Sequence, residues 1–534
     1  MVVLSSKNKA VITLLFVCII SLIYIALNWV SLIDDAYIFF RYAHNIIQGY
    51  GYSFNSGHPV EGTTSVTWTM LLVGFELCHI PAEVSVKILG TLCVLGILFL
   101  LGNEFYKTAV PSSVGLLVFA LLIFDKNFIL SVMMGLETGL YALLLLAICS
   151  VSRQYVEQGG QLRARAMGGI GVLLFLTRPE SVAILVLLGC GLVFLHQKHK
   201  NHSLTPIFIW ILGITSTTLW RWFAFGDVIP NSARAKSVLV FSNIHWSIVW
   251  PRIVAGSLYV ENALLPAWFL VVLGVVGLVS GRKSFQVYGA FSALFVGIGV
   301  TLMNSGDWMP FSRLLTPYLP ITALLAGIGV HKLRMLPGKR WHKKVEWASF
   351  FLAVLITLNA FWSLQGRNFF VAAQWPTGMC YRKLGQVLQP YISKQNLVAP
   401  EALGQLGYTL IDVPMLDFFG LTDSYIARNG VIPIETYTLG KHHYQYTMQQ
   451  SPDLFLLHSD ITNHIPLLNQ WGYSQQYTTF RITDTQLKCE LLVGTKNLLA
   501  ADLLPVLEQN FKVQRVATSQ IPKNLAATWP EGAR

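Results

Sequence analysis

The stretch VITLLFVCIISLIYIALNWV (residues 11–30) is followed directly by SLIDDAYIFFRYA (31–43). The first segment has the length and composition of a membrane-crossing helix, because a span needs about 20 mainly apolar residues. Asp34, Asp35 and Arg41 therefore stand where a membrane helix emerges from lipid. Charged side chains are costly in the hydrocarbon core, so charges kept at its boundary indicate a function. This pair of segments predicts chemistry at a membrane surface.

The composition of the whole chain is that of a polytopic membrane protein. Its 534 residues are 54% hydrophobic and only 12% charged, with a mean hydropathy of +0.54. These values exclude an ordinary soluble multidomain protein. The net charge of +12 does not indicate a nucleic-acid partner, because most Lys and Arg residues lie in short segments between apolar runs. Lys7 and Lys9 precede the first run and no small-residue cleavage site follows it, which predicts a retained anchor.

The apolar runs predict eleven transmembrane helices, with the N-terminus inside and the C-terminus outside. The predicted spans are 11–30, 84–102, 109–125, 136–152, 166–177, 180–196, 205–224, 260–280, 285–303, 314–331 and 345–364. The run Val66–Ile80 is shorter and contains Glu76 and His79, so we expect it to lie on the membrane surface as an amphipathic helix. With this topology the basic clusters fall on the inner side, as the positive-inside rule requires.

The chain after residue 365 changes to ordinary polarity and reads as a separate mixed α/β domain. Strands are expected at Leu454–Leu457 and Cys489–Val493, and helices at Cys380–Gln389 and Leu499–Gln509. The predicted fold is therefore an all-α polytopic membrane domain, 1–365, whose outer loop 31–83 contains amphipathic helices, and an outward soluble domain, 366–534. Cys380 and Cys489 either form a disulfide in an oxidising compartment or stay unpaired, and the sequence leaves both alternatives open.

The predicted topology collects on the outward face the polar residues that no charge-bias rule explains. Ten of them are candidate site residues: Asp34, Asp35, Arg41, Glu61, Glu137, Arg178, Glu180, Asp307, Trp308 and Arg313. Asp34 and Asp35 begin an amphipathic helix, where aspartate commonly acts as an N-cap. Alternatively, two adjacent acids in a partly desolvated cleft raise each other's pKa toward the range of a general base.

The cationic candidates also allow two interpretations. Arg178, in the sequence Thr-Arg-Pro-Glu, interrupts an apolar hairpin; it either forms an internal salt bridge with Glu180 or presents a guanidinium to a phosphate. Asp307, Trp308 and Arg313 lie in a short loop shaped by Gly and Pro. A tryptophan at this level suits the headgroup region, and the Asp307/Arg313 pair is a candidate for substrate contact.

Several short motifs follow one another in a distinctive order. Asp-Asp-Ala-Tyr-Ile-Phe-Phe-Arg-Tyr-Ala at 34–43 and Val-Glu-Gly at 60–62 come first. They are followed by Gly-Leu-Glu-Thr at 135–138, Thr-Arg-Pro-Glu at 177–180, Gly-Asp-Trp-Met-Pro at 306–310 with Arg313, and Gly-Leu-Thr-Asp at 420–423. Together they resemble the AftB-like arabinofuranosyltransferases of the GT-C superfamily, over about residues 31 to 425. The chain also resembles the LphB-type membrane proteins of Legionella-like bacteria.

The resemblance implies an inverting glycosyltransferase at the periplasmic face of the bacterial inner membrane. Its donor would be a polyprenyl-phosphate-linked sugar and its acceptor an envelope glycan or glycolipid. In GT-C enzymes the carboxylate that starts the first outer loop is the base, so the resemblance assigns this role to Asp34, with Asp35 as the second acid. Arg178 and Arg313 would hold the donor phosphate. The segment 231–236 departs from the family pattern, and neither the sugar nor the acceptor follows from the resemblance.

No cofactor is predicted, because the cysteines and histidines show no metal-ligand spacing. Some GT-C enzymes use a divalent metal, for which Asp34, Asp35 and Glu137 are the available acids, but we do not predict one. A transporter or flippase for lipid-linked sugars is the main alternative, although it would place ionisable residues near the midplane of repeated, broken helices. A non-catalytic envelope assembly factor is the other alternative.

Overall fold

The computed structural model describes residues 6–27, 32–199, 203–236, 246–281, 284–307, 309, 311–335, 339–364, 376–431, 440–458 and 464–516. The contacts divide the chain into two compact units. Unit 1 comprises Met1–Val30, Glu83–Thr217 and Ile244–Ala373, and unit 2 comprises Ser31–Ala82, Thr218–Asn243 and Gln374–Arg534. The expected domain division at residue 366 stays a prediction; the structure groups Ser31–Ala82 with the C-terminal part of the chain.

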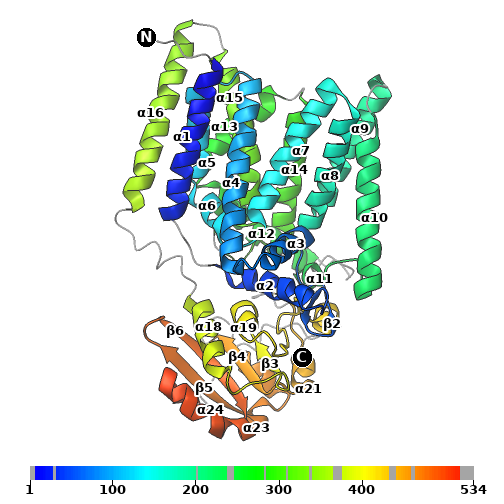
Figure 1. Ribbon diagram of the computed structural model, residues 1–534, viewed down its shortest axis with the longest axis vertical. Helices are drawn as coiled ribbons and strands as arrows, with labels where there is room; N and C mark the ends of the chain where they lie inside the picture. Colours follow the sequence, from blue (N-terminus) through cyan, green and yellow to red (C-terminus); the bar gives the residue numbers. More distant parts are fainter. Residues whose placement is uncertain are drawn as a thin grey trace. The chain divides into compact units, whose positions relative to one another are not determined.

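Within the described residues, unit 1 is built from helices alone (Figure 1). These helices are α1 (Ser6–Leu27), α4 (Ala82–Lys107), α5 (Ser112–Ile123), α6 (Lys126–Met133), α7 (Thr138–Gln158), α8 (Gln161–Thr177), α9 (Ser181–His199), most of α10 (Thr205–Phe225), α12 (Trp246–Leu264), α13 (Trp268–Ser280), α14 (Phe285–Met303), η1 (Thr316–Tyr318), α15 (Leu319–Arg334) and α16 (Lys339–Leu364). Glycine allows two of them to pack closely. A Cβ on Gly277 of α13 would lie 1.8 Å from the Leu325 carbonyl oxygen of α15, the kind of close approach that small residues permit between membrane helices.

The helices of unit 1 identify a multi-pass membrane protein. Among the described residues, seven helices (α1, α4, α7, α9, α10, α14 and α16) are long and apolar enough to cross a membrane. Two bent pairs, α5 with α6 at 59° and α12 with α13 at 98°, raise the number to nine if each pair counts as one span. The expected spans 166–177 and 314–331 are helices, but α8 and α15 have only 17 and 16 residues.

The expected span 260–280 is not a continuous helix. The chain breaks between Leu264 and Trp268, at the junction of α12 and α13. Pro266 explains the break, because proline lacks a backbone N–H and disfavours the helical conformation of the residue before it. The apolar composition of 260–280 therefore predicted a helix correctly on either side of Pro266 but missed the bend.

Unit 2 combines short helices with a five-stranded mixed sheet, in the order β3-β4-β6-β5-β7. Its strands are β1 (Ser53–Asn55), β2 (His58–Pro59), β3 (Val398–Pro400), β4 (Leu454–His458), β5 (Tyr477–Asp484), β6 (Cys489–Lys496) and β7 (Lys512–Arg515). Its helices are α2 (Asp34–Ile47), α3 (Val66–Leu77), α11 (Asn231–Lys236), α18 (Pro376–Leu388), α19 (Gly404–Thr409), α20 (Ser424–Asn429), α21 (Tyr444–Gln449), α22 (Ile465–Asn469), α23 (Tyr473–Gln476) and α24 (Asn497–Asn510). The pair β3–β4 is parallel and the other pairs are antiparallel. The mixed α/β character expected for the C-terminal part is confirmed.

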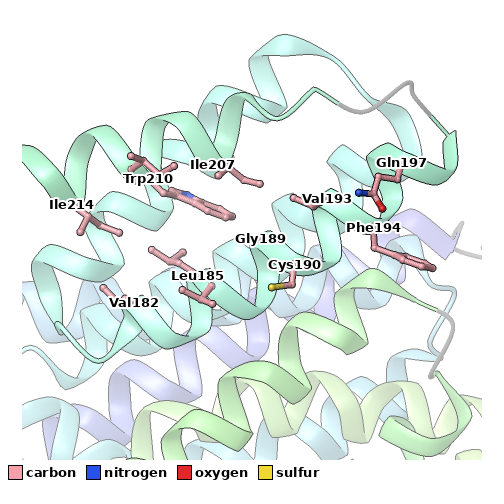
Figure 2. A pocket seen from close by; sticks show the side chains of 12 residues that line it. Val182, Leu185, Gly189, Cys190, Val193, Phe194, Gln197, Ile207, Trp210 and Ile214 are labelled. Carbon is pink, nitrogen blue, oxygen red and sulfur yellow. The ribbon is translucent and has the colours of Figure 1, made fainter.

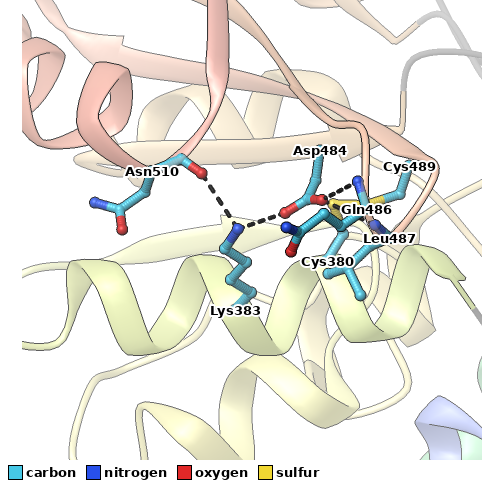
Figure 3. Close-up of a disulfide and its surroundings, with 7 residues drawn as sticks. All are labelled: Cys380, Lys383, Asp484, Gln486, Leu487, Cys489 and Asn510. Atoms are coloured by element: carbon cyan, nitrogen blue, oxygen red, sulfur yellow. Dashed lines mark hydrogen bonds and ion pairs between the residues drawn. A yellow bond between two sulfur atoms is a disulfide. The ribbon is translucent and has the colours of Figure 1, made fainter.

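A disulfide between Cys380 of α18 and Cys489 of β6 fastens a helix of unit 2 to its sheet (Figure 3). Their Cα atoms are 6.3 Å apart, across 109 residues of sequence. Beside it, the Lys383 Nζ atom lies 2.5 Å from Asp484 Oδ2 and also donates to the Asn510 carbonyl. Of the two alternatives that the sequence left open, the structure has the paired form.

Candidate functional site

Asp34 is the first residue of α2, yet its carboxylate does not cap that helix. The N-cap position of α2 is Ile33, and no side chain caps it. Instead, Asp34 Oδ2 accepts a 2.7 Å hydrogen bond from the Gly404 N–H, and Oδ1 accepts one of 2.8 Å from the Gln405 N–H. These are the first two amides of α19, whose positive end favours a carboxylate. Asp34 therefore fastens α2 to α19 and is only 5% exposed.

Burial dominates the ionisation of Asp34. It raises the pKa of this carboxyl to about 6, against the lowering effect of the Gln405 and Gly404 amides. The charge of Asp35 raises the pKa further, and that of His458 lowers it. The expected mutual effect of the two aspartates is present, but burial is the larger cause. A carboxylate with this pKa is ionised at neutral pH and still has appreciable affinity for a proton, as a general base requires.

Asp35 is the more accessible of the two acids. Its side chain is 19% exposed, and its Oδ2 atom lies 4.0 Å from the Nζ atom of Lys236. Lys236 is the last residue of α11, in the segment 231–236 that departs from the family pattern. Unit 2 therefore places a cation beside the aspartate pair.

The guanidinium of Arg41 is buried and binds backbone groups of unit 2. The side chain is 2% exposed and lies over the Phe54 ring at 4.4 Å. It donates to the backbone carbonyls of Phe54, Gly407 and Val413 at 2.7–2.8 Å, with longer bonds of 3.4 Å to the Leu410 carbonyl and Asn55 Oδ1. Each of the five guanidinium N–H groups thus has an acceptor in the protein. The geometry makes Arg41 a clamp within unit 2, and its expected substrate contact stays a prediction.

Glu61 likewise forms part of the framework of unit 2. Its carboxylate accepts bonds of 2.7 and 2.9 Å from Arg221, and both side chains are 2% exposed. Its backbone carbonyl accepts from the Asn231 N–H, and Asn231 Nδ2 donates to the carbonyls of Gly420 and Leu421. Three motifs far apart in the sequence are thereby joined. Arg221 was missed because it lies within an apolar run; an arginine near the end of a predicted span was the signal that could have identified it.

In unit 1, Glu137, Arg178 and Glu180 form one ionic group. Arg178 occupies the break between α8 and α9, and its Nε and Nη2 atoms are each 3.0 Å from Glu137 Oε1. Its Nη1 atom is 3.6 Å from Glu180 Oε1, beyond hydrogen-bond length. The guanidinium is 5.2 Å from the Tyr141 ring centre. The two glutamates raise the pKa of Arg178 against the effect of burial. The expected ion pair with Glu180 is present at 3.6 Å, and Glu137 is the hydrogen-bonded partner.

Asp307 and Arg313 also form the expected pair, with Arg313 Nε 2.9 Å from Asp307 Oδ2. Tyr259 of α12 lies beside them, because its hydroxyl accepts from the Leu314 N–H at 3.3 Å. The same phenol is within electrostatic range of Asp307, Arg313 and Arg178. Tyr259 is therefore close to the Asp307/Arg313 pair, and it was not among the residues predicted from the sequence. Trp308 lies outside the described residues.

An apolar cavity of about 550 Å³ lies between α9 and α10 of unit 1 (Figure 2). Val182, Leu185 and Trp210 are among its lining residues, and Gln197 is the polar side chain near one end. Val182, the first lining residue in the chain, is the second residue of α9 and lies four positions after Arg178 in the sequence. From Val182 to Gln197 the lining of α9 extends about 22 Å. An extended apolar chain would match this lining.

The predicted residues thus fall into two groups, one in each unit. Unit 2 contains Asp34, Asp35, Arg41 and Glu61, and unit 1 contains Glu137, Arg178, Glu180, Asp307 and Arg313. Across the described ranges, no group of three or more His, Cys, Asp or Glu residues is arranged to hold a metal ion.

The fold of this multi-pass membrane protein is the GT-C fold, as comparison with solved structures shows. ArnT from Cupriavidus metallidurans in the apo state matches with a TM-score of 0.52 and 11% identity, over 92% of this chain and 98% of ArnT. The structure of the same ArnT bound to undecaprenyl phosphate matches with a TM-score of 0.50 over the same shares. At this identity the likeness concerns the fold alone.

The chain is homologous to the terminal β-(1→2)-arabinofuranosyltransferase of Mycobacterium tuberculosis. The two are 26% identical over 388 residues, which are 64% of this chain and 58% of the relative. The chain therefore matches less than two thirds of the length of that relative. A family model described as a domain of unknown function, DUF8728, matches residues 370–497. The relationship to the arabinofuranosyltransferases expected from the motifs is confirmed.

Proposed function

We propose that the protein is an inverting glycosyltransferase that moves a sugar from a polyprenyl-phosphate donor to an envelope glycan or glycolipid. One observation carries the proposal: the buried Asp34 carboxylate, fixed by two backbone amides and with a pKa of about 6, begins α2 in a chain with the ArnT fold. The homologous arabinofuranosyltransferase supports the reaction class. The proposed site faces the periplasm of a bacterial inner membrane, with the N-terminus in the cytoplasm.

The role of Asp34 follows from the chemistry of the acceptor. A sugar hydroxyl is a poor nucleophile, so a carboxylate removes its proton as the oxygen attacks the anomeric carbon. The new C–O bond forms as the bond to the phosphate oxygen breaks, and the bond electrons leave with the polyprenyl phosphate. The proton ends on Asp34. A single displacement inverts the anomeric centre and forms no covalent enzyme intermediate, and Asp35 is the second acid beside the acceptor.

Arg178 is the proposed phosphate-binding cation. Charge accumulates on the phosphate as it leaves, and a fixed guanidinium stabilises that charge. Glu137 holds the Nε and Nη2 atoms of Arg178 at 3.0 Å. Among the residues that the structure describes, the Nη1 atom is paired only with Glu180, at 3.6 Å, so this edge of the guanidinium is the one proposed to donate to a phosphate oxygen. Arg313, paired with Asp307, is a second candidate.

The polyprenyl chain of the donor is proposed to occupy the cavity between α9 and α10. The lining is apolar, and it starts at Val182 in the first turn of α9, four residues after Arg178 in the sequence. A lipid phosphate bound to Arg178 is proposed to extend its hydrocarbon chain along α9. The ArnT structure with undecaprenyl phosphate supports a ligand of this class.

The proposal is tested with membranes that contain wild type or Asp34→Asn at equal expression. Labelled polyprenyl-phosphate sugars serve as donors and cell-envelope glycolipid as acceptor. Transfer by the wild type and its loss in Asp34→Asn would establish both the enzyme and its base. Equal transfer by both proteins would remove Asp34 as the base. If neither protein transferred sugar from a panel of donors, the transporter of lipid-linked sugars would become the better interpretation.

A further inference from the structure

A second buried acid, Glu401, lies close to the segment that holds Asp34. Glu401 directly follows β3, and its N–H donates to the Leu456 carbonyl of β4 at 2.8 Å. Its side chain is only 1% exposed. Glu401 has no part in the proposed reaction. A buried carboxylate needs compensating partners, because desolvation of a charge is costly.

Two histidines supply that compensation. Glu401 Oε1 lies 3.1 Å from His458 Nδ1 and 3.5 Å from His464 Nε2, and Glu401 Oε2 accepts from the His458 backbone N–H at 2.8 Å. His464 is held on its other side by the Tyr444 hydroxyl, 2.9 Å from Nδ1. The charges of His464 and His458 lower the pKa of Glu401 well below its usual value. Glu401 therefore stays ionised in the core of unit 2.

Only a short connection separates Glu401 from the amides that bind Asp34. Residues 401–403 join β3 to α19, and Gly404 and Gln405 begin that helix. A Cβ on Gly404 would lie 1.8 Å from the Asp34 carbonyl oxygen, so the backbone at Gly404 packs directly on the start of α2. One end of the segment 401–405 is thus fixed by Glu401 and the other by Asp34.

We propose that Glu401, His458 and His464 form a positioning network that fixes the segment 401–405 and, through its amides, the orientation and proton affinity of Asp34. The inference deepens the proposed function and rests on it, because Asp34 matters here as the base. The three residues act through Asp34 and do not contact substrate in this proposal.

Several titratable groups share this region of unit 2. The groups with an electrostatic or hydrogen-bond link to Glu401 or to its histidines are His458 of β4, His464 at the start of α22, Tyr444 of α21, His442, Tyr381 of α18 and, through His458, Asp34 of α2. Among them, His458 connects the two carboxylates. Its charge favours the ionised form of both Glu401 and Asp34. Loss of that charge should therefore raise the pKa of Asp34.

The test compares His458→Gln and Glu401→Gln with wild type in the full chain, in lipid nanodiscs. His443→Gln is the matched control, because His443 caps α21 and has no described contact with Glu401. The measurements are kcat, the KM for donor and acceptor, the pH–rate profile and the midpoint of thermal unfolding. Carboxyl infrared titration, with the Asp34 band assigned by its loss in Asp34→Asn, follows Asp34 without turnover.

The network predicts that kcat falls roughly 10- to 100-fold in both variants, with KM unchanged. In His458→Gln the acid limb of the profile and the infrared titration of Asp34 should move to higher pH, and His443→Gln should match wild type. An unchanged Asp34 titration would overturn the proposal, as would a loss of activity that only follows a lower unfolding midpoint. If wild type shows no transfer, the proposed function fails, and the infrared titration still decides whether the network acts on Asp34.

Discussion

Asp34 in unit 2 and Glu137 in unit 1 are both buried acids of the predicted site, but different groups stabilise their carboxylates. Asp34 is held by two backbone amides, which carry only partial charge. Glu137 is held by the full charge of Arg178, at 3.0 Å. Burial raises the pKa of Asp34 to about 6, whereas Arg178 is kept cationic by its glutamates. The way each acid is compensated supports the proposed division of roles, with Asp34 as the proton acceptor and Arg178 as the fixed cation.

The strongest test of this contrast is Asp34→Asn. We expect transfer to fall by about 10²- to 10⁴-fold, because an amide cannot accept the acceptor's proton. Asp35→Asn is the matched control, and we expect it to retain more activity. Rates are measured with purified protein at equal thermal stability. A larger loss in Asp35→Asn than in Asp34→Asn would reverse the roles of the two acids.

The contrast also predicts the behaviour of Arg178→Lys. The lysine keeps the charge but loses the planar guanidinium that holds Glu137 with one edge and is proposed to bind the phosphate with another, so we expect transfer to fall by about 10²-fold. Arg153→Lys is the control, because Arg153 also forms a buried ion pair, 2.9 Å from Glu104 in the same unit. It should lower the unfolding midpoint while leaving the transfer rate of the folded protein near that of wild type. Equal losses of transfer in both variants would show that the Arg178 pair is purely structural.

The raised pKa of Asp34 gives two opposite dependences on pH. The native pKa of Asp34 lies above the usual value of 3.8. Protonation of Asp34 therefore contributes to the free energy of unfolding, and this contribution is fully present below about pH 4 and is lost as pH rises through about 6. The loss amounts to at most about 3 kcal/mol. The transfer rate should instead rise with pH through the same range, because the base must be ionised. Asp34→Asn should lack this slope in denaturant unfolding, and a rate independent of pH between 5 and 7 would argue against Asp34.

A smaller effect is expected from Gly404→Ala. The added Cβ would lie 1.8 Å from the Asp34 carbonyl oxygen, so α19 and α2 must move apart, at a cost of about 1–3 kcal/mol. Gly74 of α3 has open space around it, which makes Gly74→Ala a suitable control in unit 2. The two variants are compared by thermal unfolding and by the Asp34 titration. Equal unfolding midpoints for both would show that the contact between α2 and α19 is not rigid.

The smallest effect is expected in the apolar cavity. Gly189 of α9 lines it, and a Cβ there would meet Ile207 and Trp210 only at ordinary contact distance, 3.9 Å. Gly189→Leu should therefore fold, and its side chain should fill part of the cavity. Because it would displace a few methylene groups of the donor lipid, we expect the donor KM to rise several-fold, which corresponds to a loss of about 1 kcal/mol in binding free energy. Gly169→Leu on α8, where nothing lies within 4 Å, should not change it. An unchanged donor KM in Gly189→Leu would place the lipid chain elsewhere.

Local patterns in the sequence were enough to predict much of the fold. Apolar runs located the helices, and the polar tail contained the expected strands at β4 and β6. The prediction failed at Pro266, where the run 260–280 bends. A count of apolar residues does not register that proline lacks the backbone N–H that a continuous helix needs. The disulfide between Cys380 and Cys489 could not be predicted either, because the distance between the two residues depends on how the whole sheet of unit 2 is assembled.

The candidate site was predictable in its acids and cations but not in their partners. Asp34 stood out by its place after the first span, yet its partners Gly404 and Gln405 are 370 and 371 residues away. Glycine and glutamine carry no sequence signal for such a contact, because their backbone amides do the binding. Arg41 and Glu61 were predicted as site residues because of their charge. The structure shows that both side chains bind other groups of the protein. Glu401 gave no signal, as a lone acid in a polar segment is usually a solvated one.

The bond between Asp34 and the amide of Gly404 also has a consequence for biosynthesis. The ribosome adds about 5–20 residues per second, so roughly 20 to 75 seconds separate the synthesis of Asp34 from that of its partner. During this interval the carboxylate lacks the amides that orient it, and β6, to which the disulfide attaches α18, has not yet been made. A nascent or truncated chain would therefore contain the acidic motif without its working geometry. Unit 2 is assembled from three distant segments, so the geometry of Asp34 forms only after the C-terminal segment has been synthesised.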